Sequence, residues 1–433
     1  MRLAIAAALL LSTAPSFAID AVTYKGTLGG HDIVVELADP GNGDPVGRYS
    51  YMSQGGDIPL NALEEVDGYI GLLEEAPCTE TTCVSDDNGV ITNKPIGAVW
   101  ILQYAADGSL GGNWGAEGKQ SKTLDVTLTE IGRRTLPEGT EITPYGLYDS
   151  TQQLTYSGGT SFTPEAAPYD FAKMDVALEE GPVEVLEGSS FRYVTDPRSK
   201  FAFPRIVAFA DGSSTDAANA ALAAEHAQIN YFAFDCLSLV YGGFGGRGDM
   251  LDMGYGTLGD FDYESVTMAY LSPTLVGWTE GGSTWCGGAY PNNHFDSYII
   301  DAKTGAPFAM GLVFKDWTAT TNYDDYDADV DQAAALANPG RYGWQAGQPL
   351  IDYVIANRVV SDDETYETEC GIDELIASNL GMRFAPDDTV VFSLVGLPHV
   401  IFACGDDLVT VKLADIPQFL APTAKDYFPA LAD

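Results

Sequence analysis

Hydrophobic and polar residues alternate with a period of two over most of residues 21–131. In the segment HDIVVELAD, for example, Val35 and Leu37 fall on one face of a strand, while Val34 and Glu36 fall on the other. Similar segments follow at close spacing, and each is bounded by Gly, Asn or Asp. Residues 19–131 are therefore predicted to form an all-β domain, either a small barrel or a sandwich.

The alternation stops between residues 132 and 181. Pro137, Pro144, Pro164 and Pro168 interrupt this span, and it contains no internal repeat and no low-complexity run. Because proline lacks a backbone donor and ends regular elements, the span is predicted to be a linker with docked segments.

Residues 182–433 mix two periodicities. Segments 190–196, 200–210 and 266–273 alternate as strands do. The run 215–234 is rich in alanine, which favours helix, and a Ser and a Thr that can cap a helix stand at its start. Strands and helices that do not alternate regularly predict an α+β domain with a mixed or antiparallel sheet, and hence an α+β fold overall.

The C-terminal part of this domain is predicted to add short elements. Helical periodicity favours two short helices at 349–359 and 371–380, the second ended by Gly381 in a left-handed cap. Three closing strands are expected at 389–396, 399–404 and 408–415.

The stretch 285–314, WCGGAYPNNHFDSYIIDAKTGAPFAMGLVF, stands near the middle of this domain. Its pattern predicts a turn at 286–293, a strand at 295–301, a Lys-Thr-Gly turn and a second strand at 308–314. Apolar residues fall on both faces of the first strand, so both faces are expected to be partly covered.

The first residues, MRLAIAAALLLSTAPSFA, combine one Arg, an apolar run and small residues before Ile19. This combination is typical of a cleavable signal peptide at residues 1–18. The later apolar run 389–404 contains Gly396 and Pro398 and is too short to span a bilayer. We therefore expect an exported protein of the periplasm or extracellular space, without a membrane span.

All six cysteines follow the predicted signal peptide. An even number in an exported chain favours three disulfides, although six cysteines allow 15 pairings. A metal site would require CxxC-type spacing or clustered histidines, and the sequence has neither. The favoured pairing joins Cys78 to Cys83, Cys236 to Cys286, and Cys370 to Cys404.

The net charge of the chain limits the kinds of partner that it is expected to bind. The chain has 21 basic and 62 acidic residues, a formal net charge of −41. A field of this sign repels nucleic acid and anionic membranes, and it attracts a cationic partner. Solubility, or adaptation to a saline habitat, is the alternative explanation for the same charge.

Two loops supply candidate binding residues. One is the turn within 285–314, and the other is the Gly-rich segment 241–264. The second contains a G-x-G-x-x-G spacing, but no helix is predicted directly after it, so dinucleotide binding is not expected. The candidates are Tyr290, Asn292, Asn293 and His294 in the turn, and Phe244 and Arg247 in the Gly-rich segment.

Alternating aspartates in NYDDYDADVDQ offer oxygen ligands that could hold Ca²⁺. An EF-hand is excluded, because the positions that require Gly and Glu hold Val330 and Leu336. A solvated acidic loop is the alternative, and no other cofactor is predicted. The candidate ligands are Asp325, Asp327, Asp329 and Asp331.

The sequence supplies no catalytic residue set. It has four scattered histidines, no G-x-S-x-G motif, and a plausible disulfide partner for every cysteine. A non-enzymatic protein is therefore favoured over an enzyme. A carboxylate-dependent glycan hydrolase remains open, because carboxylate spacing cannot be read from a sequence.

The order of short motifs resembles a known family. GGAYPN at 287–292, DAKTG at 301–305 and a segment ending in Val313 and Phe314 are similar to the pattern GGAHPN…D-x-x-TG…L-x-D-L-F. That pattern marks the domain of unknown function shared by the extracytoplasmic region of the anti-sigma factor RsiV and the N-terminal region of the deacetylase PdaC. The resemblance covers about residues 183–422. Tyr290 stands where the family usually has His, so no role carries over to that position.

The resemblance implies binding more than catalysis. In RsiV the domain binds and senses lysozyme, whereas deacetylation in PdaC belongs to a separate catalytic domain whose motifs this chain lacks. The first hypothesis is thus an exported, non-enzymatic binding or sensing protein of the cell envelope, for a cationic protein such as lysozyme or for a cell-wall glycan. The alternatives are a carboxylate-dependent hydrolase of cell-wall or other glycans, and a structural envelope protein.

Overall fold

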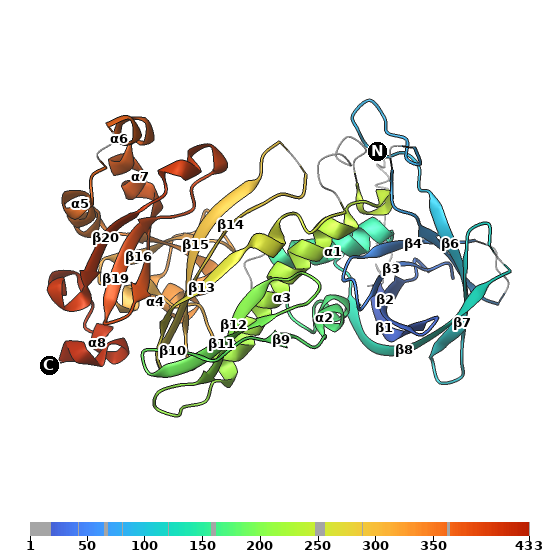
Figure 1. Ribbon diagram of the computed structural model, residues 1–433, viewed down its shortest axis with the longest axis horizontal. Helices are drawn as coiled ribbons and strands as arrows, with labels where there is room; N and C mark the ends of the chain where they lie inside the picture. The colour runs from blue at the N-terminus through green and yellow to red at the C-terminus, as the bar shows by residue number, and fades with distance from the viewer. Residues whose placement is uncertain are drawn as a thin grey trace, which may run out of the picture.

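The computed structural model shows a β-barrel at one end of the molecule and several small sheets at the other (Figure 1). The long helix α3 (Asp216–Ser238) lies between the two ends. The fold is α+β, as the sequence predicted. The predicted signal peptide lies outside the residues that the structure describes, which are 19–41, 43–64, 68–79, 81–119, 121–156, 162–246, 256–287, 289–361 and 364–432.

The N-terminal domain is a closed antiparallel barrel, which decides between the two predicted architectures. Each strand pairs with the next one along the chain, and β1 also pairs with β8, so the sheet closes. Closure leaves the barrel without a free strand edge. The strands are β1 (Asp20–Leu28), β2 (His31–Ala38), β3 (Val46–Tyr51), β4 (Ile58–Ala62), β5 (Ile70–Glu75), β6 (Ile96–Tyr104), β7 (Leu110–Ala116) and β8 (Thr123–Thr135).

Inward-pointing side chains fill the barrel. Trp100 of β6 is fully buried, and its ring lies 4.9 Å from the ring of Tyr49. Trp100 and Trp114, which are register partners, donate their indole N–H groups to Glu74 Oε2 at 2.9 and 2.7 Å. The Glu74 carboxylate, placed among these aromatic rings, is therefore hydrogen-bonded.

The span expected to be a linker folds onto the barrel. It contains α1 (Pro144–Tyr156), which contacts β3 and β4, and α2 (Pro168–Met174), which contacts β1, β2 and β8. Helix α2 also contacts α3, so this span joins the barrel to the second half of the chain.

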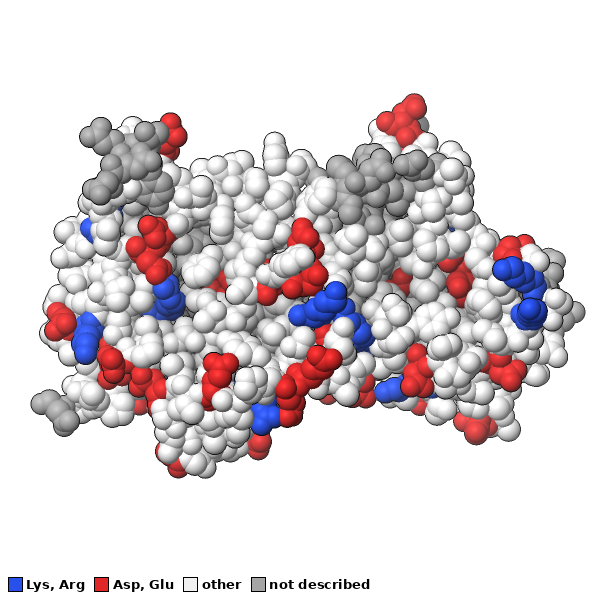
Figure 2. Space-filling view, viewed as in Figure 1, with Lys and Arg blue, Asp and Glu red and all other residues white. Residues whose placement is uncertain are grey.

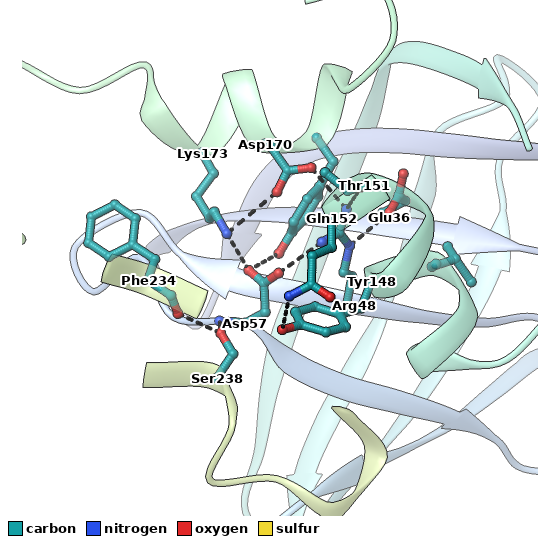
Figure 3. A network of polar contacts seen from close by, with 12 residues as sticks. Glu36, Arg48, Asp57, Tyr148, Thr151, Gln152, Asp170, Lys173, Phe234 and Ser238 are labelled. Carbon is teal, nitrogen blue, oxygen red and sulfur yellow. Dashed lines mark hydrogen bonds and ion pairs between the residues drawn. The ribbon is translucent and has the colours of Figure 1, made fainter. Parts of the chain in front are cut away.

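A cluster of buried charges lies beneath α1 and α2 (Figure 3). Arg48 is its centre: Nε donates to Glu36 Oε2 at 2.8 Å, Nη1 to Asp57 Oδ2 at 3.1 Å, and Nη2 to Asp170 Oδ2 at 3.0 Å. Lys173 Nζ donates to Asp57 Oδ1 at 2.7 Å. We call this cluster the buried network; its charged members are Glu36, Arg48, Asp57, Arg134, Asp170 and Lys173.

Charges of opposite sign balance one another in the buried network. Three cations face three carboxylates, and all six residues are almost fully buried. Although burial alone would raise the pKa of Glu36, Arg134 and Arg48 lower it to about 2. Ser238 of α3 accepts a hydrogen bond from the Asp57 backbone N–H at 2.8 Å, so the network also fixes α3 against the barrel.

The described residues of the C-terminal half form four small sheets, and every strand pair in them is antiparallel. Helix α3 packs on β12, and the central ribbon of β13, β14 and β15 lies between it and the C-terminal sheet. The strands are β9 (Glu179–Glu180), β10 (Glu184–Leu186), β11 (Ser189–Thr195), β12 (Ala202–Ala208), β13 (Ser265–Leu271), β14 (Leu275–Thr284), β15 (Asn292–Asp301), β16 (Trp317–Asn322), β17 (Tyr342–Ala346), β18 (Leu380–Ala385), β19 (Thr389–Leu394) and β20 (Asp407–Lys412).

Short helices cover the C-terminal sheets, and two of them lie at the predicted positions 349–359 and 371–380. They are α5 and α7, which contact each other and pack against β20 and β19 respectively. The helices are α4 (Gln332–Ala337), α5 (Gln348–Asn357), α6 (Glu364–Cys370), α7 (Ile372–Asn379) and α8 (Ala424–Tyr427).

Two predicted strands are wrong. The segment 308–314 contains the 3-10 helix η4 (Met310–Leu312) and has one isolated bridge, from Phe314 to Leu420, with another at Pro307 just before it. The segment 399–404 is the 3-10 helix η6 (His399–Cys404). Gly396, at φ 65°, and Pro398 turn the chain before η6, so β19 cannot continue.

Gly381 does not end α7 as a left-handed cap. The helix passes directly into β18 at Leu380, whose backbone is extended. A Cβ at Gly381 would lie 2.4 Å from Val395 Cγ2. Glycine is needed here for the close approach of the neighbouring strand.

The three disulfides have the pairing that the sequence favoured. They join Cys78 to Cys83, Cys236 to Cys286, and Cys370 to Cys404, and no free cysteine remains among the described residues. The second ties the C-terminal end of α3 to the turn between β14 and β15. Among the described residues, no helix combines the length and apolar content that crossing a membrane requires.

Candidate functional site

Strands β14 and β15 bring polar side chains together by their register. Glu280 of β14 lies opposite Asp296 of β15, and Gly282 lies opposite His294. Because residues two apart in a strand point to the same face, all four positions share one face of the ribbon. Side chains that face each other in this way have Cβ atoms about 5 Å apart.

This face borders a cavity of about 580 Å³. Helix α3 contributes Glu225 and Phe232 to the lining, the segment before β13 contributes Phe261 and Glu264, and the loop 396–398 completes it. None of the described residues that line the cavity is Lys or Arg. We call it the acidic pocket, after Glu225, Glu264, Glu280, Asp296 and His294.

Glu264 and His294 form an ion pair inside the acidic pocket. His294 Nε2 contacts Glu264 Oε1, and His294 Nδ1 lies 3.1 Å from the Asn292 carbonyl oxygen. The hydrogen bond to Glu264 raises the pKa of His294 to about 9. The imidazole is therefore protonated at neutral pH, and both ring nitrogens donate.

Gly282 leaves the space that Glu264 occupies. A Cβ at this position would lie only 1.7 Å from Glu264 Oε2, so any other residue would displace the carboxylate. The Glu264 side chain is only 3% exposed, and Oε2 is buried without a hydrogen-bond donor among the described residues. A buried carboxylate oxygen that lacks a donor is costly, and a donor from a ligand would satisfy it.

Glu280 is the most strongly perturbed carboxyl group of the pocket. It is 6% exposed, and Trp278 Nε1 donates to its Oε1 at 2.7 Å. Burial, with the nearby charges of Glu225 and Glu264, raises the pKa of Glu280 to about 8. Glu280 is therefore largely protonated at pH 7 and ionises in slightly alkaline solution.

Charges of one sign dominate the acidic pocket. Burial raises the pKa of Glu225 and of Asp296, which shows that neither carboxyl group has enough positive charge nearby to offset its desolvation. The only cation among the lining residues is His294, set against four carboxyl groups. Acidic side chains also outnumber basic ones over the visible face of the molecule (Figure 2).

The pocket suits an organic cation. Its carboxyl groups accept hydrogen bonds from an ammonium or guanidinium group, and the rings of Phe232, Phe261 and Tyr298 line the same space. Among the described residues, no three His, Cys, Asp or Glu side chains are arranged to hold a metal ion. The facing carboxyl groups of Glu280 and Asp296 also form a potential acid–base pair.

Three of the predicted binding residues lie at the acidic pocket. Asn292, Asn293 and His294 all line it. Tyr290 does not: it is 67% exposed, and its ring stacks on His399 at 5.2 Å between centroids. The predicted binding residues of this turn therefore lie partly in the pocket and partly on the surface beside it.

Phe244 is not a surface binding residue. It is 1% exposed and packs against Tyr148 of α1 at 5.2 Å between ring centroids, because residues 241–244 pack with Tyr148 and Ile58. Arg247 lies outside the described residues.

The alternating aspartates are not gathered into a metal site among the described residues. Asp331 accepts hydrogen bonds from the backbone N–H groups of Ala333 and Ala334 and so caps α4. Asp325 accepts one from the Asp327 backbone N–H at 3.2 Å. These contacts fit the alternative of a solvated acidic loop with turn and cap roles.

The four carboxyl groups of the acidic pocket are not among the residues that the sequence predicts. They come from α3, from the segment before β13 and from two strands, and 62 acidic residues in the chain offered no means of choosing them. One feature near Glu280 pointed to the site. Gly282 follows Glu280 by two residues, on a strand that pairs with the strand that carries His294.

Comparison with known proteins identifies no relative of this chain. No family model matches the chain, and a search of curated proteins found no match.

Proposed function

We propose that the chain is an exported binding or sensing protein of the cell envelope, and that its acidic pocket receives a cationic group of the partner. The observation that carries the proposal is the buried Glu264 Oε2, which has no donor among the described residues and lines a cavity with three further carboxyl groups. The three disulfides fit an oxidising compartment, and the net charge of −41 favours encounter with a cationic partner.

A cationic protein such as lysozyme is the proposed partner. The sequence resemblance suggests it, and its lysine and arginine side chains can supply a donor to Glu264 Oε2. Long-range attraction accelerates association at low salt, and the desolvated contact in the pocket confers specificity.

The test is titration of residues 19–433 with lysozyme at low and at high ionic strength. Removing one charge by Glu264→Gln is expected to weaken binding at least tenfold, because a buried charge-assisted contact is lost. Glu130→Gln removes the same charge from the barrel surface and is expected to change binding less than about twofold. Equal effects of the two variants would show that only the overall charge matters.

A second function is favoured by one specific observation. Glu280 faces Asp296 across the strands, and burial raises the pKa of Glu280 to about 8, so Glu280 holds a proton that it can donate near neutral pH. This arrangement suits a carboxylate-dependent glycan hydrolase. Release of reducing ends from peptidoglycan, abolished by Glu280→Gln, would establish it; glycan binding without cleavage would instead identify a glycan-binding protein.

A further inference from the structure

A second cavity, of about 960 Å³, adjoins the acidic pocket. Glu225, Gln228 and Tyr298 line both cavities, so the two meet along one side of α3. The α3 residues that border them run from Ala220 to Phe232, a length of about 18 Å at the rise of an α-helix. We call the combined cavity the α3 groove.

The second cavity is mainly apolar. Alanines of α3 lie along it, and Phe171 and Met174 of α2 and Ile300 of β15 contribute larger apolar side chains. Polar groups occur where the two cavities meet, at Gln228 and Tyr298. Small side chains beside scattered polar groups suit a segment of polypeptide, whose backbone needs both hydrogen-bond partners and apolar contact.

Arg205 lines the second cavity and has no carboxylate partner among the described residues. Its Nη1 donates to the carbonyl oxygens of Pro204 and Leu222 at 2.8 and 3.3 Å, and its Nη2 donates to His226 Nδ1 at 3.1 Å. Burial and the charge of Arg205 lower the pKa of His226 to about 4, so the imidazole is neutral and accepts this bond. The guanidinium charge itself is left unbalanced.

An unbalanced arginine is unusual in this molecule. Arg48, Arg198 and Arg358, which are also buried or partly buried, each donate to at least one carboxylate. Asp175, also in the lining of the second cavity, is paired with Lys25 at 3.1 Å. The α3 groove therefore carries unsatisfied charges of opposite sign, negative in the acidic pocket and positive at Arg205, which lies beside Leu222 and His226.

We propose that the α3 groove binds an extended peptide segment in which a lysine or arginine enters the acidic pocket and a carboxylate about four residues away pairs with Arg205. Leu222 and His226, which Arg205 contacts, precede Phe232 of the acidic pocket by about 15 and 9 Å along α3. An extended chain advances about 3.3 Å per residue, so about four residues span this distance. The inference rests on the proposed function for its acidic end, and the contact with Arg205 extends it.

The test uses two blocked pentapeptides with three central alanines, one beginning with lysine and ending with aspartate and the other in the reverse order. Titration of residues 19–433 is expected to show saturable binding of one of them. Replacing aspartate by asparagine, or lysine by glutamine, in that peptide is expected to weaken binding about tenfold. Absence of saturable binding of both peptides up to about 1 mM would overturn the proposal.

Two variants separate this inference from the proposed function. In Arg205→Gln the preference for aspartate over asparagine should disappear while the preference for lysine remains; in Glu264→Gln the reverse should hold. Arg133→Gln, a surface arginine on the barrel, is the matched control and should keep both preferences. If Arg205→Gln keeps the aspartate preference, the inference is wrong even where the proposed function stands. If Glu264→Gln keeps the lysine preference, the acidic pocket is not the cation site.

Discussion

The buried network and the acidic pocket contain similar residues in opposite arrangements. In the network, three cations face three carboxylates at distances of 2.7 to 3.1 Å, apart from one longer contact of 3.6 Å. In the pocket, four carboxyl groups share the lining with a single imidazole, and no lysine or arginine lines the described part of the cavity.

The difference separates a structural role from a binding role. Arg134 and Arg48 hold Glu36 in its charged form, whereas burial holds Glu280 largely in its neutral form at pH 7. A balanced cluster already has its partners and fixes the barrel, α2 and α3 together. An unbalanced cluster requires protons or a cationic ligand before its charges are stabilised.

The largest expected effect is on stability and belongs to the buried network. Arg48→Met leaves Glu36, Asp57 and Asp170 buried without their central cation, so the free energy of unfolding should fall by about 3 to 5 kcal/mol. Denaturant unfolding measures it, with the surface variant Arg133→Gln expected to change stability by less than about 0.5 kcal/mol. A loss below about 1 kcal/mol for Arg48→Met would contradict the structural role.

The next effect is on binding and belongs to the acidic pocket. In Gly282→Ala the new methyl group would displace Glu264, because the Cβ position lies 1.7 Å from Oε2. Lysozyme binding is expected to weaken at least tenfold, measured by titration.

Gly277→Ala is the matched control for Gly282→Ala. It lies on the same strand, and its nearest neighbour would be 3.6 Å away, an ordinary contact distance. Binding should therefore be nearly unchanged in this variant. If both alanine variants bind equally well, the position of Glu264 has no bearing on recognition.

A smaller effect concerns pH. Burial raises the pKa of Glu280 to about 8, and the contact with Glu264 raises that of His294 to about 9. As pH rises from 6 to 9 the pocket therefore gains negative charge and loses its internal cation, so affinity for a lysine-containing peptide should rise several-fold. Titration over this range measures it. Glu280→Gln should flatten the rise, and a flat profile in the unaltered chain would exclude Glu280 and His294 from recognition.

The smallest effect is expected at Tyr290. Its ring is exposed and stacks on His399 outside the pocket lining, so Tyr290→Ala should change lysozyme binding by less than about twofold. The result is read in the same titrations. A loss as large as that of Glu264→Gln would place the binding surface at the outer turn.

The sequence predicted what local patterns determine. Period-two alternation predicts the barrel strands, alanine content predicts α3, and the cysteine spacing favours the observed disulfides. The strand and helix patterns depend on residues close together in the sequence, and disulfide formation depends on an oxidising compartment. The two wrong strands, at 308–314 and 399–404, are apolar segments that lack a pairing partner, and alternation alone does not reveal a missing partner.

The site was predictable only in part, because it is assembled from distant segments. The position of His294 in a turn predicts a binding role for it. Glu225 and Glu264 line the same pocket but come from α3 and from the segment before β13. Phe244 shows the converse error: a glycine-rich context suggested an exposed loop, and tertiary packing buried the ring against Tyr148.

The most direct measurement compares the free energy of unfolding of Glu36→Gln and Glu280→Gln at pH 9. The folded-state pKa of Glu36 is lowered to about 2, so its stabilising contribution is fully present above its ordinary pKa and is lost only as pH falls toward 2. The folded-state pKa of Glu280 is raised to about 8, so its contribution is present at low pH and is lost as pH rises through that value. Glu36→Gln should therefore lower the free energy of unfolding by about 3 kcal/mol or more, while Glu280→Gln should leave it unchanged or raise it. Equal losses in the two variants would contradict the distinction between a balanced network and an unbalanced pocket.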